Sequence, residues 1–519
     1  MRSIFRYCAG LPLCVSFSVA AQLDSIQARY AATITQSDLR EHLTVLASDA
    51  YEGRETGAKG QKMAAAYIRE HFVAYGIPPV PDAGAKGLLN GYEQPFPLEL
   101  SRPGGMSLIM DGTSIGFMQE FFYLSEKLRE DYGTDSIIYA GYGDQPAGWE
   151  AKDKTVLMLE DGGGGVTRTD RPPLDFFQQL TRKAAVAEAA GARVLLVASP
   201  DARDMMEEYA HYITSPRMKL MDGKEDKRSM KSAVQTVIID KPTAERILKS
   251  AKLSWKKAVK KAHAPARALP FAFDARYVSN QQVLQGENIL GYVEGTDMKD
   301  ELVVVTAHYD HIGTDKDDVF NGADDDGSGT VAVMEMAQAF AKAKAEGHGP
   351  RRSVLFMPVS GEEKGLLGSE WYSEHPVFPL ANTVADLNID MIGRVDTQHT
   401  DSAPYVYIIG SDRLSSELHR INEEANATYT KLVLDNTFNS ENDPNRFYYR
   451  SDHYNFAKHG IPVIFYFNGV HADYHQPGDE VSKIRFDLLE QRSRLVFHTA
   501  WELANREKRI VVDKPLPKE

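Results

Sequence analysis

Cysteine is nearly absent from this chain of 519 residues, which contains only Cys8 and Cys14. Both lie in the first 21 residues, where Arg2 and Arg6 precede an apolar stretch that ends in small residues at Ala21. This pattern is typical of a cleaved signal peptide. We therefore expect a secreted or periplasmic mature chain without cysteine, which excludes disulfides, thiol nucleophiles and cysteine ligands for a metal.

Long apolar runs and an excess of basic residues are missing as well. No apolar run of about 18 residues follows the first 21 residues, so we expect no membrane span in the mature chain. The formal net charge is −14, and a nucleic-acid partner is excluded because phosphate binding needs clustered Lys and Arg. The one basic stretch, residues 249–263, is typical of a solvated helix face or a linker, with a binding patch as the alternative. No His-Glu-x-x-His motif occurs, and we expect neither serine nor thiol hydrolysis.

The segment from residue 125 to residue 270 has an alternation of its own. Strand-like runs occur at 136–140, 155–159, 193–198 and 234–239. A helical run at 176–190 ends at Gly191, as helices commonly do. Residues 265–270 are interpreted as a linker, and we expect this segment to be a smaller, β-rich inserted domain without a catalytic group.

The flanking segments, residues 22–124 and 271–519, are predicted to form one discontinuous catalytic domain. Helices are expected at 37–47, 60–75, 329–343, 415–425 and 486–505. Short β-rich runs are expected at 302–306, 353–359, 384–389, 405–409 and 462–467. Strands that alternate with helices favour an α/β fold, a three-layer sandwich with a mostly parallel central sheet.

Acidic and histidine residues follow the ends of several of these β-rich runs. They are His308-Tyr309-Asp310, Glu362-Glu363, Asp390 and His475, together with Asp324-Asp325-Asp326 before a helix. Ligands gather at the carboxyl ends of parallel strands, so we expect these groups to converge at one edge of the sheet. Each group alone is a weak signal, but their joint placement indicates a metal site.

Two histidines and several carboxylates suit zinc, which accepts nitrogen and oxygen ligands. This set could serve two ions if one aspartate bridges them. Two dipositive ions would lower the pKa of a bridging water and form hydroxide near neutral pH. A further carboxylate that binds no metal could then act as the general base.

The motifs also resemble those of a known family in order and spacing. They are His308-Tyr309-Asp310, residues 322–329 (Gly-Ala-Asp-Asp-Asp-Gly-Ser-Gly), Gly361-Glu362-Glu363, Asn388-Ile389-Asp390 and Tyr474-His475-Gln476-Pro477. The chain is similar to the co-catalytic zinc peptidases typified by bacterial leucyl aminopeptidases and glutamate carboxypeptidase, over about residues 38–76 and 288–505. The middle segment resembles a protease-associated domain through the turn at residues 140–143 and the helix–strand unit at 183–199.

The resemblance implies two zinc ions and a role for each matching residue. His308 and Asp390 would hold one ion, Glu363 and His475 the other, and Asp325 would bridge them. Glu362 matches the general base, and Asp310 matches a carboxylate that orients His308. Tyr474 matches a tyrosine that binds the oxyanion in some relatives, with simple packing as its alternative. Glu52 and Arg54 match a common loop with a structural role, and residues 451–453 (Ser-Asp-His) recur near the substrate cleft.

These roles imply a secreted exopeptidase that hydrolyses peptides through a metal-bridging hydroxide. We expect an aminopeptidase, because carboxylates left over at the site attract an α-ammonium group. The leftover carboxylates are Glu362, Asp310 and Asp324 or Asp326. A carboxypeptidase or dipeptidase is the main alternative, with Arg446 and Arg450 as candidates to bind a substrate carboxylate. A glutaminyl cyclase with one zinc ion and a non-catalytic relative are the remaining alternatives.

Overall fold

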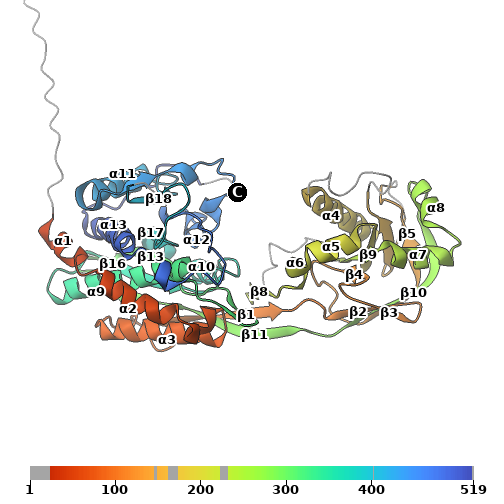
Figure 1. Ribbon diagram of the computed structural model, residues 1–519, viewed down its shortest axis with the longest axis horizontal. Coiled ribbons are helices and arrows are strands. Elements are labelled where there is room, and N and C mark those ends of the chain that lie inside the picture. The colour runs from red at the N-terminus through yellow and green to blue at the C-terminus, as the bar shows by residue number, and fades with distance from the viewer. Residues whose placement is uncertain (1–23, 145–148, 162–172, 223–231, 401–402, 517–519) are drawn as a thin grey trace, which may run out of the picture. The chain divides into compact units, whose positions relative to one another are not determined.

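The computed structural model describes residues 24–144, 149–161, 173–222, 232–400 and 403–516. The predicted signal peptide, residues 1–21, lies outside this range. The chain forms two compact units, one up to Phe96 and from Gly286 onward, the other Pro97–Gln285. In Figure 1 the first unit is red and cyan to blue, and the second is orange to green.

A seven-stranded sheet forms the centre of the first unit, in the order β12-β16-β13-β17-β20-β18-β19. The strands are β12 (Gly291–Val293), β13 (Met298–His308), β16 (Arg352–Val359), β17 (Thr383–Ile389), β18 (Tyr405–Ile409), β19 (Val433–Asp435) and β20 (Val463–Phe467). β13 pairs in parallel with β16 and β17, and β17 pairs in parallel with β20. β12 and β18 each pair antiparallel with a neighbour, so the sheet is mixed. The α/β class is therefore confirmed, with a parallel centre.

Helices cover both faces of this sheet because its strands present apolar side chains alternately to each face. In β13, Val303 and Val305 belong to one core and Leu302 and Val304 to the other. The first core includes α1 (Ser25–Ala31), α2 (Gln36–Leu46), α3 (Lys59–Ala74), α9 (Gly329–Ala345), α11 (Ser416–Ala425) and α13 (Phe486–Asn505). The second includes α10 (Leu367–Glu374) and α12 (His453–Ala457). The five helices predicted from the sequence correspond to α2, α3, α9, α11 and α13 (Figure 1).

The second unit has its own eight-stranded sheet, in the order β3-β2-β10-β5-β6-β7-β9-β4. Its strands are β2 (Met106–Met110), β3 (Thr113–Ile115), β4 (Phe121–Phe122), β5 (Tyr132–Tyr139), β6 (Thr155–Leu159), β7 (Val194–Ser199), β9 (Gln235–Asp240) and β10 (Arg267–Tyr277). Its helices are α4 (Pro173–Ala189), α5 (Ala202–Glu208), α6 (Ala210–Thr214), α7 (Lys241–Ser250) and α8 (Trp255–Lys260). β5, β6, β7 and β9 pair in parallel, so this unit is α/β and not simply β-rich.

The limits of the second unit differ from the predicted limits at residues 125 and 270. β10 pairs with both β2 and β5, which brings residues 106–110 and 267–277 into its sheet. The expected linker at 265–270 is wrong, because most of it belongs to β10, where a register shift between Pro270 and Phe273 obscures the strand pattern. Two strands, β1 (Glu93–Ser101) and β11 (Gln281–Ile289), carry the chain from one unit to the other.

Three short strands complete the fold, β8 (Arg217–Leu220), β14 (Gly313–Asp315) and β15 (Asp318–Phe320). β8 pairs with β1, and β14 pairs with β15. Within the described residues, no helix combines the length and the apolar character that a membrane crossing requires.

Candidate metal centre

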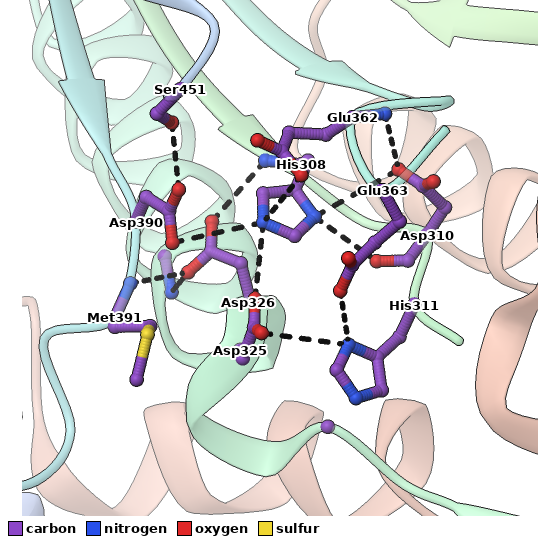
Figure 2. A network of polar contacts seen from close by, with 12 residues as sticks. His308, Asp310, His311, Asp325, Asp326, Glu362, Glu363, Asp390, Met391 and Ser451 are labelled. Carbon is purple, nitrogen blue, oxygen red and sulfur yellow. Dashed lines mark hydrogen bonds and ion pairs between the residues drawn. The ribbon is translucent and has the colours of Figure 1, made fainter. Parts of the chain in front are cut away.

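The predicted ligands converge at the carboxyl ends of the central strands of the first unit. His308 is the last residue of β13, Asp390 directly follows β17, and Glu363 follows β16. His475 lies in the loop after β20, and Asp325 lies in the short helical turn Ala323–Ser328 before α9. Figure 2 shows four of these side chains pointing toward one another.

Asp325 lies between two groups of side chains. Its Oδ1 is 3.3 Å from His308 Nε2, which is also 3.7 Å from Asp390 Oδ1. Its Oδ2 is 3.1 Å from His475 Nε2, which is also 3.2 Å from Glu363 Oε2. Each group thus offers one histidine and one carboxylate in addition to Asp325, which is the arrangement expected of a residue that bridges two ions.

Several buried polar atoms of this cluster have no hydrogen-bond partner within the described residues. They include Asp325 Oδ2 and Glu363 Oε1. Burial opposes a charge on His475, yet the carboxylates of Asp325 and Glu363 raise the pKa of His475 to about 10. Buried polar groups are normally paired, and a bound cation supplies the missing partner for such atoms. The donor set of imidazoles and carboxylates therefore fits zinc.

Asp326 also lies close to His308 and Asp390 but has another role. These three residues form one geometrically possible metal group. However, Asp326 Oδ1 accepts hydrogen bonds from the backbone N–H of Gly329 and Met391, and Oδ2 accepts one from the N–H of His308. Its carboxylate is thus used to connect α9, β13 and the end of β17. Asp325, whose side chain faces both histidines, is the better ligand.

Asp324 likewise faces the protein interior. Its Oδ1 accepts hydrogen bonds from the N–H of Gly393 and the hydroxyl of Ser328. Asp479, which the sequence analysis did not identify, accepts the N–H groups of both Asp324 and Asp325 and so fixes this turn. The expectation that Asp324 or Asp326 attracts a substrate ammonium group is therefore wrong, because both carboxylates are engaged by the protein.

Asp310 contacts His308 mainly through its backbone. The carbonyl oxygen of Asp310 is 3.1 Å from His308 Nδ1, whereas its carboxylate oxygen is 3.8 Å away. The carboxylate accepts hydrogen bonds from the hydroxyl of Thr56 and the N–H of Glu362 instead. The side chain of Asp310 thus fixes the Glu362 loop, and its main chain orients His308.

Arg54 and Ser451 support the cluster from outside. The buried guanidinium of Arg54 donates to four backbone carbonyls, including those of Tyr309 and Gly322, so its expected structural role has a geometric basis. Ser451 donates to Asp390 Oδ2 at 2.7 Å, and its own hydroxyl accepts from Asn388. Sequence reasoning assigned Ser451 no contact, because only the fold brings it beside Asp390.

Glu362 and a cavity lie on the open side of the cluster. Glu362 Oε2 is 4.0 Å from His308 Nε2, and the side chain is 11% exposed. The cavity is lined by Asp325, Glu362, Asp390 and His475 of the cluster. The other walls are Met391, Phe447, Phe465, Phe467 and Val470, with Arg450 and Tyr474. Arg446 is not among these residues, and its guanidinium lies over the Tyr449 ring.

One Gly-x-Ser-x-Gly pattern, residues 112–116, could be mistaken for a serine nucleophile motif. Such a nucleophile sits on a tight turn between a strand and a helix. Ser114 instead lies on β3, paired antiparallel with β2, and is exposed. This serine therefore has no nucleophile geometry.

Comparisons with known proteins agree with this geometry. Residues 288–500 match the model of peptidase family M28. The chain is therefore similar to peptidase family M28 over this segment, which is shorter than half of the chain. All residues of the metal cluster and the cavity lie inside the M28 segment.

Individual relatives match parts of the chain. The aminopeptidase YwaD of Bacillus subtilis is 27% identical over 43% of this chain and 46% of its own length. The probable glutamate carboxypeptidase LAMP1 of Arabidopsis thaliana is 28% identical over 31% of this chain and 22% of its own. The chain therefore spans about half or less of these curated relatives. The solved aminopeptidase of Aneurinibacillus sp. strain AM-1 covers 95% of this chain and 100% of its own, with a TM-score of 0.53 and 18% identity, a likeness of fold.

Proposed function

We propose that the chain is a zinc-dependent exopeptidase that removes residues from the amino terminus of peptides. One observation carries this proposal, namely a cavity that joins the bridging Asp325 and Glu362 to a wall of apolar side chains. The relative from Bacillus subtilis named as an aminopeptidase supports it. Family M28 consists of peptidases, so peptides are the substrate class.

The residues that would hold zinc follow from the two groups around Asp325. His308, Asp325 and Asp390 would hold one ion, and Asp325, Glu363 and His475 the other. Bound zinc supplies Lewis-acid polarisation of a carbonyl and lowers the pKa of water. The buried acceptors without partners, Asp325 Oδ2 and Glu363 Oε1, support this assignment.

Glu362 is the proposed general base. It faces the cavity beside His308, and no described residue donates a hydrogen bond to its carboxylate. Its backbone N–H is held by Asp310, so the loop that presents it is fixed. Glu362 would take a proton from the attacking water and pass it to the leaving amine. Such a positioned base accounts for roughly 10²–10⁴ in rate.

The shape of the cavity supports a free amino terminus as the feature that is recognised. Phe447, Phe465 and Phe467 offer an apolar surface to the side chain of the first residue. The negative charge of Glu362 beside the cavity favours entry of an α-ammonium group over entry of a second carboxylate. A leucyl anilide should be hydrolysed much faster than its N-acetylated form. Equal rates on the two substrates would contradict the aminopeptidase assignment.

Arg450 favours a second candidate, a carboxypeptidase or dipeptidase. Its guanidinium lines the cavity, lies 3.5 Å from the Tyr474 hydroxyl, and has no carboxylate within 4.0 Å among the described residues. A cation in this position could bind a substrate carboxylate. The Arabidopsis relative named as a glutamate carboxypeptidase is consistent with this candidate. Faster cleavage of an N-blocked dipeptide than of its C-terminal amide would favour it.

We also propose that the unit Pro97–Gln285 is a protease-associated domain that contributes no catalytic group. The absence of a catalytic group is supported because all residues of the candidate metal groups and of the cavity lie outside this unit. Substitutions on its polar surface should alter peptide preference while leaving anilide turnover unchanged. Loss of anilide turnover from one such substitution, with fold and zinc intact, would contradict this.

The location of the chain is proposed from its first 21 residues. We propose export and removal of this segment, so that the mature protein is secreted or periplasmic. Mass spectrometry of the exported protein should find an amino terminus at Ala21 or Gln22. An intact amino terminus at Met1 would contradict the proposal.

A further inference from the structure

His311 is a fully buried histidine whose ring nitrogens form no hydrogen bond. Its exposed fraction is 0%, and neither Nδ1 nor Nε2 has a hydrogen-bond partner within the described residues, although Nδ1 lies 2.8 Å from Glu363 Oε1. A histidine kept only for packing would be expected to use at least one ring nitrogen, since buried polar groups are normally paired. Hydrogen bonding within the described protein therefore does not explain why a histidine is buried at this position.

The His311 ring faces the second of the two groups around Asp325. Its Nδ1 is 2.8 Å from Glu363 Oε1 and 3.9 Å from Asp325 Oδ2 (Figure 2). All three atoms are buried and have no hydrogen-bond partner, so the short approach to Glu363 is not aligned as a hydrogen bond. A cation bound between His311 Nδ1, Glu363 Oε1 and Asp325 Oδ2 would supply the partner that these three atoms lack.

The His475 ring approaches the same two carboxylates from another direction. Its Nε2 is 3.1 Å from Asp325 Oδ2 and 3.2 Å from Glu363 Oε2, and the two imidazole rings are 5.9 Å apart at 75°. Donors at about 2.1 Å from a tetrahedral zinc ion lie about 3.4 Å from one another. The distances from His311 Nδ1 and His475 Nε2 to the carboxylate oxygens of Asp325 and Glu363 are 2.8–3.9 Å, a range that includes this value.

The backbone around His311 holds the ring in this position. The N–H of His311 donates to the carbonyl of Arg54. Gly322, with a φ of +53°, lies against the ring so closely that a Cβ there would be 2.5 Å from it. The ring is thus fixed by contacts that leave both of its nitrogens unused.

We propose that His311 is a further metal ligand, through Nδ1, at the position formed by Asp325, Glu363 and His475. The inference rests on the proposed zinc site and adds a second imidazole to one of its two positions. That position has four protein donors, whereas the position at His308 and Asp390 has three. The extra neutral donor makes the two positions unequal, so the His311 position should retain its ion longer during chelation.

The direct test is a crystal structure of the zinc-loaded wild-type protein, with the ions located by anomalous scattering. Nδ1 of His311 should lie about 2.0–2.1 Å from one ion. A separation above about 3 Å, with Nδ1 donating to Glu363 Oε1, would overturn the inference while leaving the proposed function intact. Absence of any ion from the cluster would overturn both.

A chelator competition in solution gives an independent measurement. His311→Gln removes a donor from the Nδ1 position, and His498→Gln is the matched control, because His498 is also buried but lies on α13 away from the cluster. His311→Gln should weaken one of two zinc affinities by more than the roughly 10–100-fold that loss of an outer hydrogen-bond partner costs. The control should keep both affinities. Two unchanged affinities in His311→Gln would overturn the inference.

Discussion

The two units contain the same kind of parallel strand arrangement, yet among the described residues only the first unit has groups of side chains that could hold metal ions. Both place carboxylates after their parallel strands. In the second unit, Asp161 follows β6 and pairs with the Nζ of Lys183 at 2.6 Å. Asp240 ends β9, accepts the N–H of Thr243 at the start of α7, and pairs with Arg203. Each of these carboxylates thus has a cation or a helix terminus as its partner.

In the first unit, the corresponding carboxylates face one another and histidines. Among the described residues, no Lys or Arg lies within 4.0 Å of Asp325, Glu362, Glu363 or Asp390, whose ion-pair partners are histidines. Carboxylates in a buried cluster repel one another strongly unless a positive charge is present. In both units, the strand topology places carboxylates at the ends of parallel strands. A metal site is expected where no Lys or Arg neutralises these carboxylates.

The largest effect should come from Glu362→Gln, which keeps the shape of the side chain but removes the base. Turnover of a leucyl anilide should fall by roughly 10²–10⁴ while zinc content stays the same. The matched control in the second unit is Asp240→Asn, because asparagine also caps helices well. Steady-state kinetics and elemental analysis on both variants test this. Near-normal turnover in Glu362→Gln would refute its assignment as the base.

Zinc removal should destabilise the first unit more than the second. A ligand that binds only the folded state stabilises it by about 2.7 kcal/mol at 100 times its dissociation constant. Scanning calorimetry of the whole chain with and without zinc should therefore show a shift of the transition that belongs to the first unit. Removing the carboxylate charge with Glu363→Gln should reduce that shift. A melting profile that does not respond to zinc would contradict the proposed site.

Much of the first unit could be predicted from the sequence because its signals are local. The strands of the parallel centre are buried on both faces and therefore read as short, continuous apolar runs, and all five predicted runs correspond to strands of the sheet. Helix α2 begins at Gln36 after Thr35, whose side chain accepts the N–H of Asp38. Features of this kind depend on neighbours in sequence.

Contacts between distant segments could not be predicted in the same way. Asp479 accepts a hydrogen bond from the N–H of Asp325, which lies 154 residues earlier in the chain, and no local sequence pattern predicts that hydrogen bond. His311 directly follows the His308-Tyr309-Asp310 motif, but it could not be identified because a sequence does not show which way a ring points. The strand β10 was missed because its pairing is interrupted near Pro270.

Two histidines of the first unit, His475 and His498, differ in the charges that surround them. Carboxylates raise the pKa of His475, whereas burial without them, together with Arg494, lowers the pKa of His498 to about 3. Between about pH 6.5 and pH 3 the unfolded chain therefore binds a proton at His498 that the folded chain does not. Stability from this residue is complete above pH 6.5 and is lost as the pH falls.

The size of this effect follows from the shift. Between pH 7 and pH 5, the free energy of unfolding of the wild type should fall by about 2 kcal/mol more than that of His498→Gln. Urea unfolding of both proteins at the two pH values measures the difference. His263→Gln, whose side chain is 73% exposed in the wild type, is the control and should behave like wild type. Identical pH dependence of His498→Gln and wild type would mean that His498 is not buried in its neutral form.

The smallest effect should come from Arg450→Gln, and its size distinguishes the two exopeptidase candidates. Arg450 is exposed and lies at the edge of the cavity, where water screens its charge. In an aminopeptidase, the anilide has no carboxylate for Arg450 to bind, so kcat/KM should be nearly unchanged. A dipeptide whose carboxylate approaches Arg450 should lose about tenfold or less, since an exposed pair contributes about 1 kcal/mol. In a carboxypeptidase, the bound substrate would bury its carboxylate against Arg450, and loss of a buried charge pair costs about 2–5 kcal/mol, so an N-blocked dipeptide should lose roughly 30-fold or more. Arg446→Gln is the matched control, because Arg446 lies outside the cavity lining. A large loss on the N-blocked dipeptide for Arg450→Gln alone would therefore replace the aminopeptidase assignment with the carboxypeptidase one.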